Sequence, residues 1–251
     1  MSSKGLLPES PLKGMVPTMN HTGWMIENPD RVSMAFAEYA GHIDGEALDI
    51  GCAYGVATLA ALKHGARVLA CDIEQQHLDV LEQLVPADAR ERVRTQVATL
   101  PYVDFEPARF GAVLASRVLH FLSPADVELT IVKAHRWLAP GGRLFLVADS
   151  PFSGPWKTKA PEYEQRKAAG DDWPGHFEDY AQFLRPGADP AEHPRFINVM
   201  DPDILERVCR SAGFDIIEAA WLRSGTEWGS ERDHAGVICE RPHPRYNRAS
   251  I

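Results

Sequence analysis

Short apolar stretches rich in β-branched residues alternate with helix-forming stretches along most of this chain. This alternation predicts a parallel sheet with helices on both faces, joined by right-handed crossovers. The last two strand-like stretches break the rule. Only about a dozen residues without helical periodicity separate them, which predicts a hairpin and hence an antiparallel strand. The expected strands are residues 46–51, 67–72, 92–97, 110–116, 143–149, 214–222 and 234–240.

The expected helices are read from the residues that begin and end them. Asn28 is taken as the N-cap of a first helix with proline at its first position, and Ser123 and Asp201 begin two later helices in the same way. Glycine commonly ends a helix, so the pair at residues 141–142 is expected to end the helix that follows Ser123.

Residues 151–199 differ from the rest, because prolines and aromatic residues are interleaved throughout them. The segment is too aromatic for a linker and too often broken by proline for a sheet layer, so we expect an inserted cap over a substrate. One α/β domain is expected from residues 45–150 and 200–241, with a lid and helix in 1–44 and a tail at 242–251.

Composition narrows the classes of partner. With 251 residues, of which 45% are hydrophobic, the chain can bury a full core. The net charge of -9 argues against binding nucleic acid. Residues 1–17 contain no apolar stretch of signal-peptide length and no later run is long enough to span a membrane, so a cytoplasmic protein is expected. The four cysteines are widely spaced, which favours reduced, packed side chains over a metal site.

The stretch "ALDIGCAYGVAT" places a carboxylate, Asp49, at the end of the first predicted strand and glycines at Gly51 and Gly55. A dinucleotide-binding loop would need a third glycine, and a carboxylate there would repel a pyrophosphate. The same carboxylate would favour an ammonium or sulfonium group, although it could also simply cap the next helix. Asp72 follows about 20 residues later at the end of the second strand, where an acid accepts hydrogen bonds from ribose hydroxyls. Cys52 is expected to pack in the loop rather than act as a nucleophile.

At this point the sequence resembles the class I S-adenosylmethionine-dependent methyltransferases, from Glu46 to Glu240. "LDIGCAYG" resembles their first motif with Ala53 in place of the middle glycine, and "LACDI" resembles the ribose-binding motif. "TLPY", "VLASRVLHFL" and "LAPGGRLFLV" resemble later segments in the same order. The resemblance implies a Rossmann-like, doubly wound sheet of seven strands, mostly parallel with an antiparallel last strand. It implies S-adenosylmethionine as cofactor, bound by Asp49, Gly51, Cys52, Ala53, Gly55, Asp72, Ile73, Gln96, Val97, Ser116 and Arg117.

Methyl transfer from a sulfonium is a direct displacement, so the protein mainly aligns the acceptor and excludes water. The aromatic segment 151–199 and residues 20–25 are expected to do this for a small molecule methylated on oxygen or nitrogen. His21, His120 and His176 are the candidate bases. No metal is expected. A nucleotide-cofactor oxidoreductase of the NAD(P) type and a non-catalytic S-adenosylmethionine-binding module remain as alternatives, and a homodimer is left open.

Overall fold

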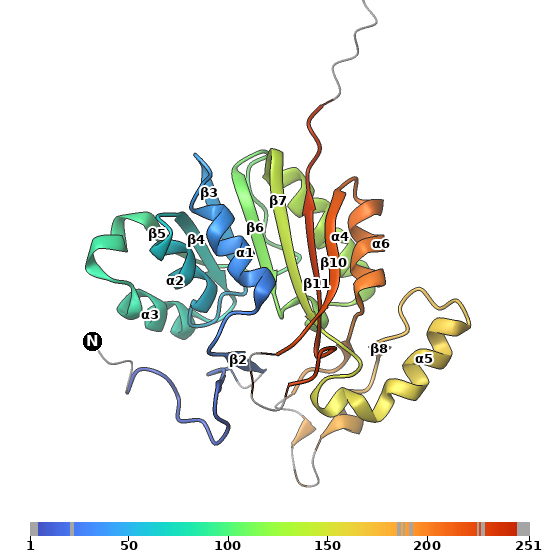
Figure 1. The fold of residues 1–251 in the computed structure, drawn as a ribbon. Helices are drawn as coiled ribbons and strands as arrows, with labels where there is room; N and C mark the ends of the chain where they lie inside the picture. Colours follow the sequence, from blue (N-terminus) through green and yellow to red (C-terminus); the bar gives the residue numbers. More distant parts are fainter. Residues whose placement is uncertain are drawn as a thin grey trace, which may run out of the picture.

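A computed structural model of the chain describes residues 5–20, 23–184, 187, 189–190, 193–224, 226 and 229–244. Its centre is a seven-stranded sheet with the strand order β10-β11-β7-β6-β3-β4-β5 (Figure 1). The strands are β3 (Glu46–Ile50), β4 (Arg67–Asp72), β5 (Val93–Val97), β6 (Phe110–Ser116), β7 (Leu138–Asp149), β10 (Asp215–Leu222) and β11 (His234–Glu240).

The expected mixture of parallel and antiparallel pairing is confirmed. The β3, β4, β5, β6 and β7 strands pair in parallel, and β11 pairs antiparallel with both β7 and β10. The amino end of β11 therefore lies at the same edge of the sheet as the carboxyl ends of the parallel strands, and His234 is opposite Asp149 in the register. This edge is where open α/β sheets bind ligands.

Helices cover both faces of the sheet. On one face, α1 (Arg31–Ala40), α2 (Val56–Lys63) and α3 (Gln75–Leu84) bury apolar side chains in one core cluster. On the other, α4 (Pro124–Trp137) and α6 (Pro202–Ser211) contribute to a larger cluster that includes the fully buried Trp137. The doubly wound architecture expected from the alternation is confirmed.

Two predicted helix ends are wrong. The N-cap of α1 is Asp30, not Asn28, because the Asp30 carboxylate accepts the Ser33 N–H at 2.9 Å. The α4 helix begins after Ser123 as expected, but it ends at Trp137 and not at the glycine pair. The pair lies within β7. Leu138 pairs with Phe110 and Arg143 with Ala112, so the register between β7 and β6 shifts across the residues that include the glycine pair. Gly141 has a φ of +79°, so its left-handed backbone occurs at the irregularity of the strand and not at the end of a helix.

The described residues between β7 and α6 include 3-10 turns at Gly154–Lys159 and Tyr180–Phe183 and the helix α5 (Ala160–Ala168). Two short strands, β8 (His176–Phe177) and β9 (Ile197–Asn198), pair antiparallel. Tyr163 of α5 is 1% exposed and packs in the larger core cluster. The segment is thus anchored in the body of the protein, and its removal would open that core.

A small hairpin of β1 (Met15–Pro17) and β2 (Trp24–Ile26) precedes α1. It lies along the same edge of the sheet as the segment between β7 and α6 (Figure 1). The described part of the chain holds no helix with the length and apolar character needed to cross a bilayer. The remaining short elements are 3-10 turns at Ala87–Arg92 and Leu119–Phe121.

Candidate functional site

A cavity of about 1160 Å³ lies at the carboxyl ends of the parallel strands. Its floor is made by the loops after β3, β4, β6 and β7, and its walls come from the β1–β2 hairpin, the segment after β7 and the start of β11. One end is built around the glycine loop after β3 and the other around Asp149 at the end of β7. We call them the cofactor end and the acceptor end.

The glycine loop has a backbone that only small residues allow. Gly51 has a φ of +77°, and a Cβ there would lie 2.0 Å from Cγ1 of Val118. Gly55 has a φ of +80°, and a Cβ would lie 2.3 Å from Cδ1 of Leu81. Ala53, which replaces the middle glycine of the motif, also has a positive φ of 46°. A left-handed conformation costs a non-glycine residue about 1–2 kcal/mol, so the loop keeps the shape of the motif at a cost in stability.

Asp49 is 2% exposed and accepts the Thr58 hydroxyl at 2.6 Å. Burial raises the pKa of Asp49 to about 6, although bonds from the hydroxyl and backbone of Thr58 act in the opposite direction. Because Thr58 lies in the first turn of α2, Asp49 does help to satisfy that helix end. It also lines the cavity, so the capping interpretation and the expected role toward a cation are compatible.

Asp72, at the end of β4, is held by three donors. Oδ2 accepts the Ala53 N–H at 2.8 Å, and Oδ1 accepts the Glu74 N–H at 3.0 Å and bonds Nδ1 of His77 at 2.9 Å. A carboxylate has about four lone-pair sites, two on each oxygen. One site on Oδ2 is therefore left for a ribose hydroxyl on the cavity side.

Cys52 packs in the loop, as expected. Its side chain is nearly buried, and its Sγ approaches the carbonyl oxygen of Ala53. Burial, followed by the charges of Asp49 and Asp72, raises the pKa of the Cys52 thiol well above its ordinary value. A protonated thiol is a poor nucleophile.

The residues expected at the adenine lie partly outside the cavity. Ile73 lines it and is 59% exposed. Gln96 and Val97 do not line it, because both are still paired with β4 in the edge strand β5. The lining residues on this side come immediately after the strand and are Ala98, Thr99 and Leu100.

Ser116 and Arg117, at the end of β6, both line the cavity. Arg117 has a φ of +58°, and its N–H donates to the Val147 carbonyl at 2.7 Å. The guanidinium donates to Asp30 at 3.0 Å and to Nε2 of His234 at 3.3 Å. Burial acts to raise the pKa of Asp30, but Arg117 and the hydrogen bonds from Ser33 outweigh it and lower the pKa. Arg117 thus joins the start of α1 to the acceptor end.

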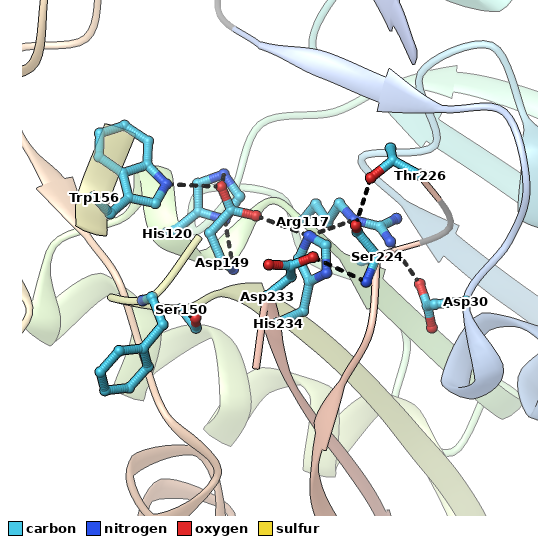
Figure 2. A network of polar contacts seen from close by, with 12 residues as sticks. Asp30, Arg117, His120, Asp149, Ser150, Trp156, Ser224, Thr226, Asp233 and His234 are labelled. Atoms are coloured by element: carbon cyan, nitrogen blue, oxygen red, sulfur yellow. Dashed lines mark hydrogen bonds and ion pairs between the residues drawn. The ribbon is translucent and has the colours of Figure 1, made fainter. Parts of the chain in front are cut away.

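The acceptor end is a connected polar group around Asp149 (Figure 2). Oδ1 of Asp149 lies 3.4 Å from Nε2 of His234, and Oδ2 accepts the Trp156 indole N–H at 3.1 Å. Burial acts to raise the pKa of Asp149, but His120 and His234 beside it hold the pKa well below its usual range. The side chain of Asp149 is 21% exposed and lines the cavity, so a charged carboxylate faces the cavity.

His120, one of the predicted candidate bases, lies in this group, but its hydrogen bonds limit what it can do. The backbone N–H of Asp149 donates to Nδ1 at 3.3 Å, so the neutral ring carries its proton on Nε2, 4.0 Å from Oδ2 of Asp149. Burial lowers the pKa of His120 despite the nearby carboxylate. The neutral ring therefore has no free lone pair with which to remove a proton in this arrangement.

Aromatic side chains surround the acceptor end. The Trp156 ring packs edge-on against Phe183 with centroids 4.9 Å apart and against Tyr180 at 5.6 Å. Tyr180 also stacks on the His193 ring at 5.7 Å. Phe121 and Trp24 line the cavity from the turn after β6 and from the hairpin. An apolar, flat molecule would be enclosed on several sides.

Of the other two predicted histidines, His176 is not part of this group. His176 is in β8, packs against Phe196 and does not line the cavity. His21 lies outside the described residues. The described residues contain no group of three or more His, Cys, Asp or Glu side chains placed to hold a metal.

Sequence reasoning did not identify Asp149, His234 or Trp156 as site residues. A signal for the first two was available, because β11 was expected to be antiparallel. Its first residue, His234, must then lie at the same sheet edge as the last residue of β7, Asp149. Trp156 carried no such signal, since it comes from an irregular turn.

Residues 47–142 match a family model described as a methyltransferase domain. The chain is 26% identical over 194 residues to a ubiquinone biosynthesis O-methyltransferase of Leptothrix cholodnii, covering 75% of this chain and 72% of that protein. It is 34% identical over 125 residues to an enzyme of the same description from Pseudomonas aeruginosa, covering 47% of this chain. The match spans 50% of that relative's length.

Among solved structures, the fold is similar to that of a 1,6-didemethyltoxoflavin-N1-methyltransferase of Burkholderia thailandensis, which binds S-adenosylhomocysteine. The TM-score is 0.57 at 18% identity, covering 85% of this chain and 78% of that one. At this level of identity, the similarity supports a shared fold and nothing further. The family model, in contrast, matches only residues 47–142, which run from β3 into β7, so that match contains the glycine loop and Asp72 and excludes residues 151–199.

Proposed function

Because the chain belongs to the class I S-adenosylmethionine-dependent methyltransferases, we propose that it methylates a small, partly aromatic acceptor at an oxygen or nitrogen that donates a hydrogen bond to Asp149. The observation that carries this proposal is the charged, partly exposed Asp149 carboxylate within an aromatic wall at one end of the cavity. The sulfonium cofactor enters the other end.

The residues at the cofactor end fit S-adenosylmethionine. Gly51 leaves the loop open where a Cβ would collide, and Asp72 keeps one lone-pair site for a ribose hydroxyl. Asp49 supplies negative charge beneath the loop, and Ala98, Thr99 and Ile73 are proposed to border the adenine. When bound, the cofactor supplies a methyl group on a positively charged sulfur, which needs no further activation.

At the acceptor end, the protein is proposed to work by orientation. The low pKa of Asp149 makes it a weak base, while the charge that it keeps lets it accept charge-assisted hydrogen bonds. It would fix the lone pair of the nucleophile toward the methyl group and favour positive charge that develops on an attacking nitrogen. For an oxygen nucleophile, it would hold the hydroxyl proton as that proton becomes more acidic. His120 and His234 keep the carboxylate in place and charged.

The choice between oxygen and nitrogen remains part of the proposal. The two curated relatives described above are named as O-methyltransferases, whereas the structural neighbour described above is named as an N1-methyltransferase. Asp149 suits either, because both a hydroxyl and an amine carry a proton that it can accept in a hydrogen bond.

The test uses S-adenosylmethionine labelled with ¹³C in the methyl group and a small-molecule extract from the source cells, with the Asp149→Asn variant as the matched blank. We expect one labelled product that depends on Asp149, and its carbon–proton NMR correlation identifies an O-methyl or an N-methyl group. No labelled product from this extract, with label transferred instead to protein or nucleic acid in a whole-cell lysate, would contradict the proposal of a small acceptor. If S-adenosylhomocysteine does not bind in calorimetry while NADH does, the oxidoreductase alternative is correct.

We also propose that the enzyme acts in the cytoplasm without nucleic-acid or membrane partners. The net charge of -9 and four buried, unpaired cysteines support this proposal. A homodimer is compatible with it, and light scattering of the purified chain would decide that point.

A further inference from the structure

His77 connects the cofactor end to the N-terminal hairpin. Its side chain is 2% exposed and lies in α3, with one ring nitrogen facing Asp72 and the other facing Met19. The backbone N–H of Met19 donates to Nε2 at 3.1 Å. Because a backbone N–H can only donate, Nε2 is an acceptor, and the neutral ring carries its proton on Nδ1, where it donates to Asp72 at 2.9 Å.

The hairpin has a second hydrogen bond to the same region. The Tyr54 hydroxyl, from the glycine loop, donates to the Pro17 carbonyl at 2.9 Å, and the Tyr54 ring packs edge-on against His77 at 5.0 Å. Val16 of β1 is buried between Tyr54 and α3 in a small apolar cluster. Both hydrogen bonds thus come from side chains that lie against groups proposed to hold the cofactor.

The hairpin is also a wall of the cavity. Met15, Trp24 and Met25 line it, opposite the polar group around Asp149. A shift of the hairpin therefore changes the space available to an acceptor. His77 is the shortest connection between that wall and the carboxylate at the cofactor end.

We propose that His77 is a positioning residue that couples occupation of the cofactor site to the position of the β1–β2 hairpin. The inference rests on the proposed function, because it assumes that Asp72 binds the ribose. A ribose hydroxyl on Oδ2 fixes the Asp72 carboxylate, Oδ1 then fixes Nδ1 of His77, and Nε2 fixes the chain at Met19. The bound cofactor thereby completes the acceptor cavity, so the cofactor binds first and the acceptor second.

The experiment measures amide hydrogen exchange of a peptide covering residues 15–26, with and without saturating S-adenosylhomocysteine, and the dissociation constant of that ligand by calorimetry. For the unsubstituted chain, we expect the ligand to slow amide exchange of the hairpin by about tenfold. This is the size expected if local opening of the hairpin must break one or two additional hydrogen bonds. No slowing in a chain that binds the ligand would overturn the coupling.

Substitutions at His77 separate its two hydrogen bonds. His77→Asn keeps a side-chain N–H near Nδ1 for Asp72 but does not reach Met19, so ligand affinity should stay within about threefold while the slowing of exchange is lost. His77→Leu loses both bonds, and ligand affinity should fall by about tenfold. A merely structural role would instead lower affinity and hairpin protection together in both variants. The exposed His42→Asn is the matched control and should resemble the unsubstituted chain.

Tyr54→Phe provides a route that leaves His77 and Asp72 intact. It removes the bond to Pro17 but keeps the path through His77, so we expect most of the ligand-dependent slowing to remain, with little change in ligand affinity. If His77→Asn fails to fold, this variant decides, and complete loss of the slowing would assign the coupling to Tyr54 and refute the role of His77. Failure of the unsubstituted chain to bind S-adenosylhomocysteine would instead refute the proposed function, so the two failures are distinguishable.

Discussion

The cofactor end and the acceptor end of the cavity are built in different ways. At the cofactor end, Asp49, the glycine loop and Asp72 lie within two consecutive strand-loop-helix units, and backbone N–H groups hold the essential carboxylate. At the acceptor end, Asp30, Arg117, Asp149 and His234 come from four distant parts of the chain, and side chains hold one another. The first end is set by local sequence, and the second is set only by the completed fold.

This difference indicates where the chain can vary. The backbone contacts of the cofactor end leave little freedom, because a Cβ at Gly51 or Gly55 would collide with a neighbouring side chain. The acceptor end can change its shape through any of four segments without disturbing the cradle. We expect substitutions at the acceptor end to alter turnover and those at the cofactor end to alter cofactor affinity.

The largest expected effect is at Asp149. Asp149→Asn removes the charge that orients the nucleophile while keeping the size of the side chain. Methyl transfer should fall by about 100-fold, as expected for a misplaced acceptor, with affinity for S-adenosylhomocysteine within about twofold. Glu162→Gln, an exposed acid on α5, is the control for charge. Equal losses of cofactor affinity and turnover would mean that the two ends are not separable.

A smaller effect is expected at Asp72. Asp72→Ala should weaken S-adenosylhomocysteine binding by at least about tenfold in calorimetry, because a charged acceptor for the ribose hydroxyl is lost. It also leaves the Ala53 and Glu74 N–H groups without their acceptor, so thermal unfolding should be measured alongside. The exposed Asp79→Asn on α3 is the control. An unchanged dissociation constant would remove Asp72 from the ribose site.

The smallest effect is expected from Asp49 and depends on pH. Folding raises its pKa from 3.8 to about 6, so folding favours the protonated form. That contribution to the free energy of unfolding is full below pH 3.8 and is lost as the pH rises through about 6. A cationic sulfur should stabilise the charged form that appears above that pH.

The preference for S-adenosylmethionine over uncharged S-adenosylhomocysteine should therefore rise by about threefold between roughly pH 5 and 7.5. In Asp49→Asn the preference should be smaller and independent of pH, whereas the exposed Asp44→Asn should behave as the unsubstituted chain. A pH-dependent preference that survives in Asp49→Asn would assign Asp49 to helix capping alone.

The predictability of the two ends follows from their construction. Strand and helix periodicity located all seven strands of the sheet, and the spacing of Asp49, Gly51 and Asp72 located the cofactor end. Gln96 and Val97 do not line the cavity because both are still paired with β4 in β5, which ends at Val97 as expected, and the lining residues follow the strand. The end of α4 was mispredicted because the sequence alone does not show whether Gly141 ends a helix or lies at an irregularity within a strand.

At the acceptor end, His120 was predicted as a candidate base and Arg117 as a cofactor contact, but the hydrogen bond from Asp149 to His120 could not be foreseen. Trp156 reaches Asp149 from a turn that has no periodic pattern. Aromatic content suggested that residues 151–199 face a substrate, but not which of them do so. His176 shows the limit, because a histidine in the right segment can still lie outside the cavity.

The position of β11 has a consequence for the order in which the protein is made. Among the described residues it is the last strand in chain order, yet it lies inside the sheet between β7 and β10. While a nascent chain leaves the ribosome, β3, β4 and β6 can assemble the cofactor end before residue 234 has been translated. Asp149 and Arg117 gain His234 only when this final strand inserts between its neighbours. A chain that stalls or is cut before β11 would therefore display a nearly complete cofactor cradle without the capacity to hold an acceptor.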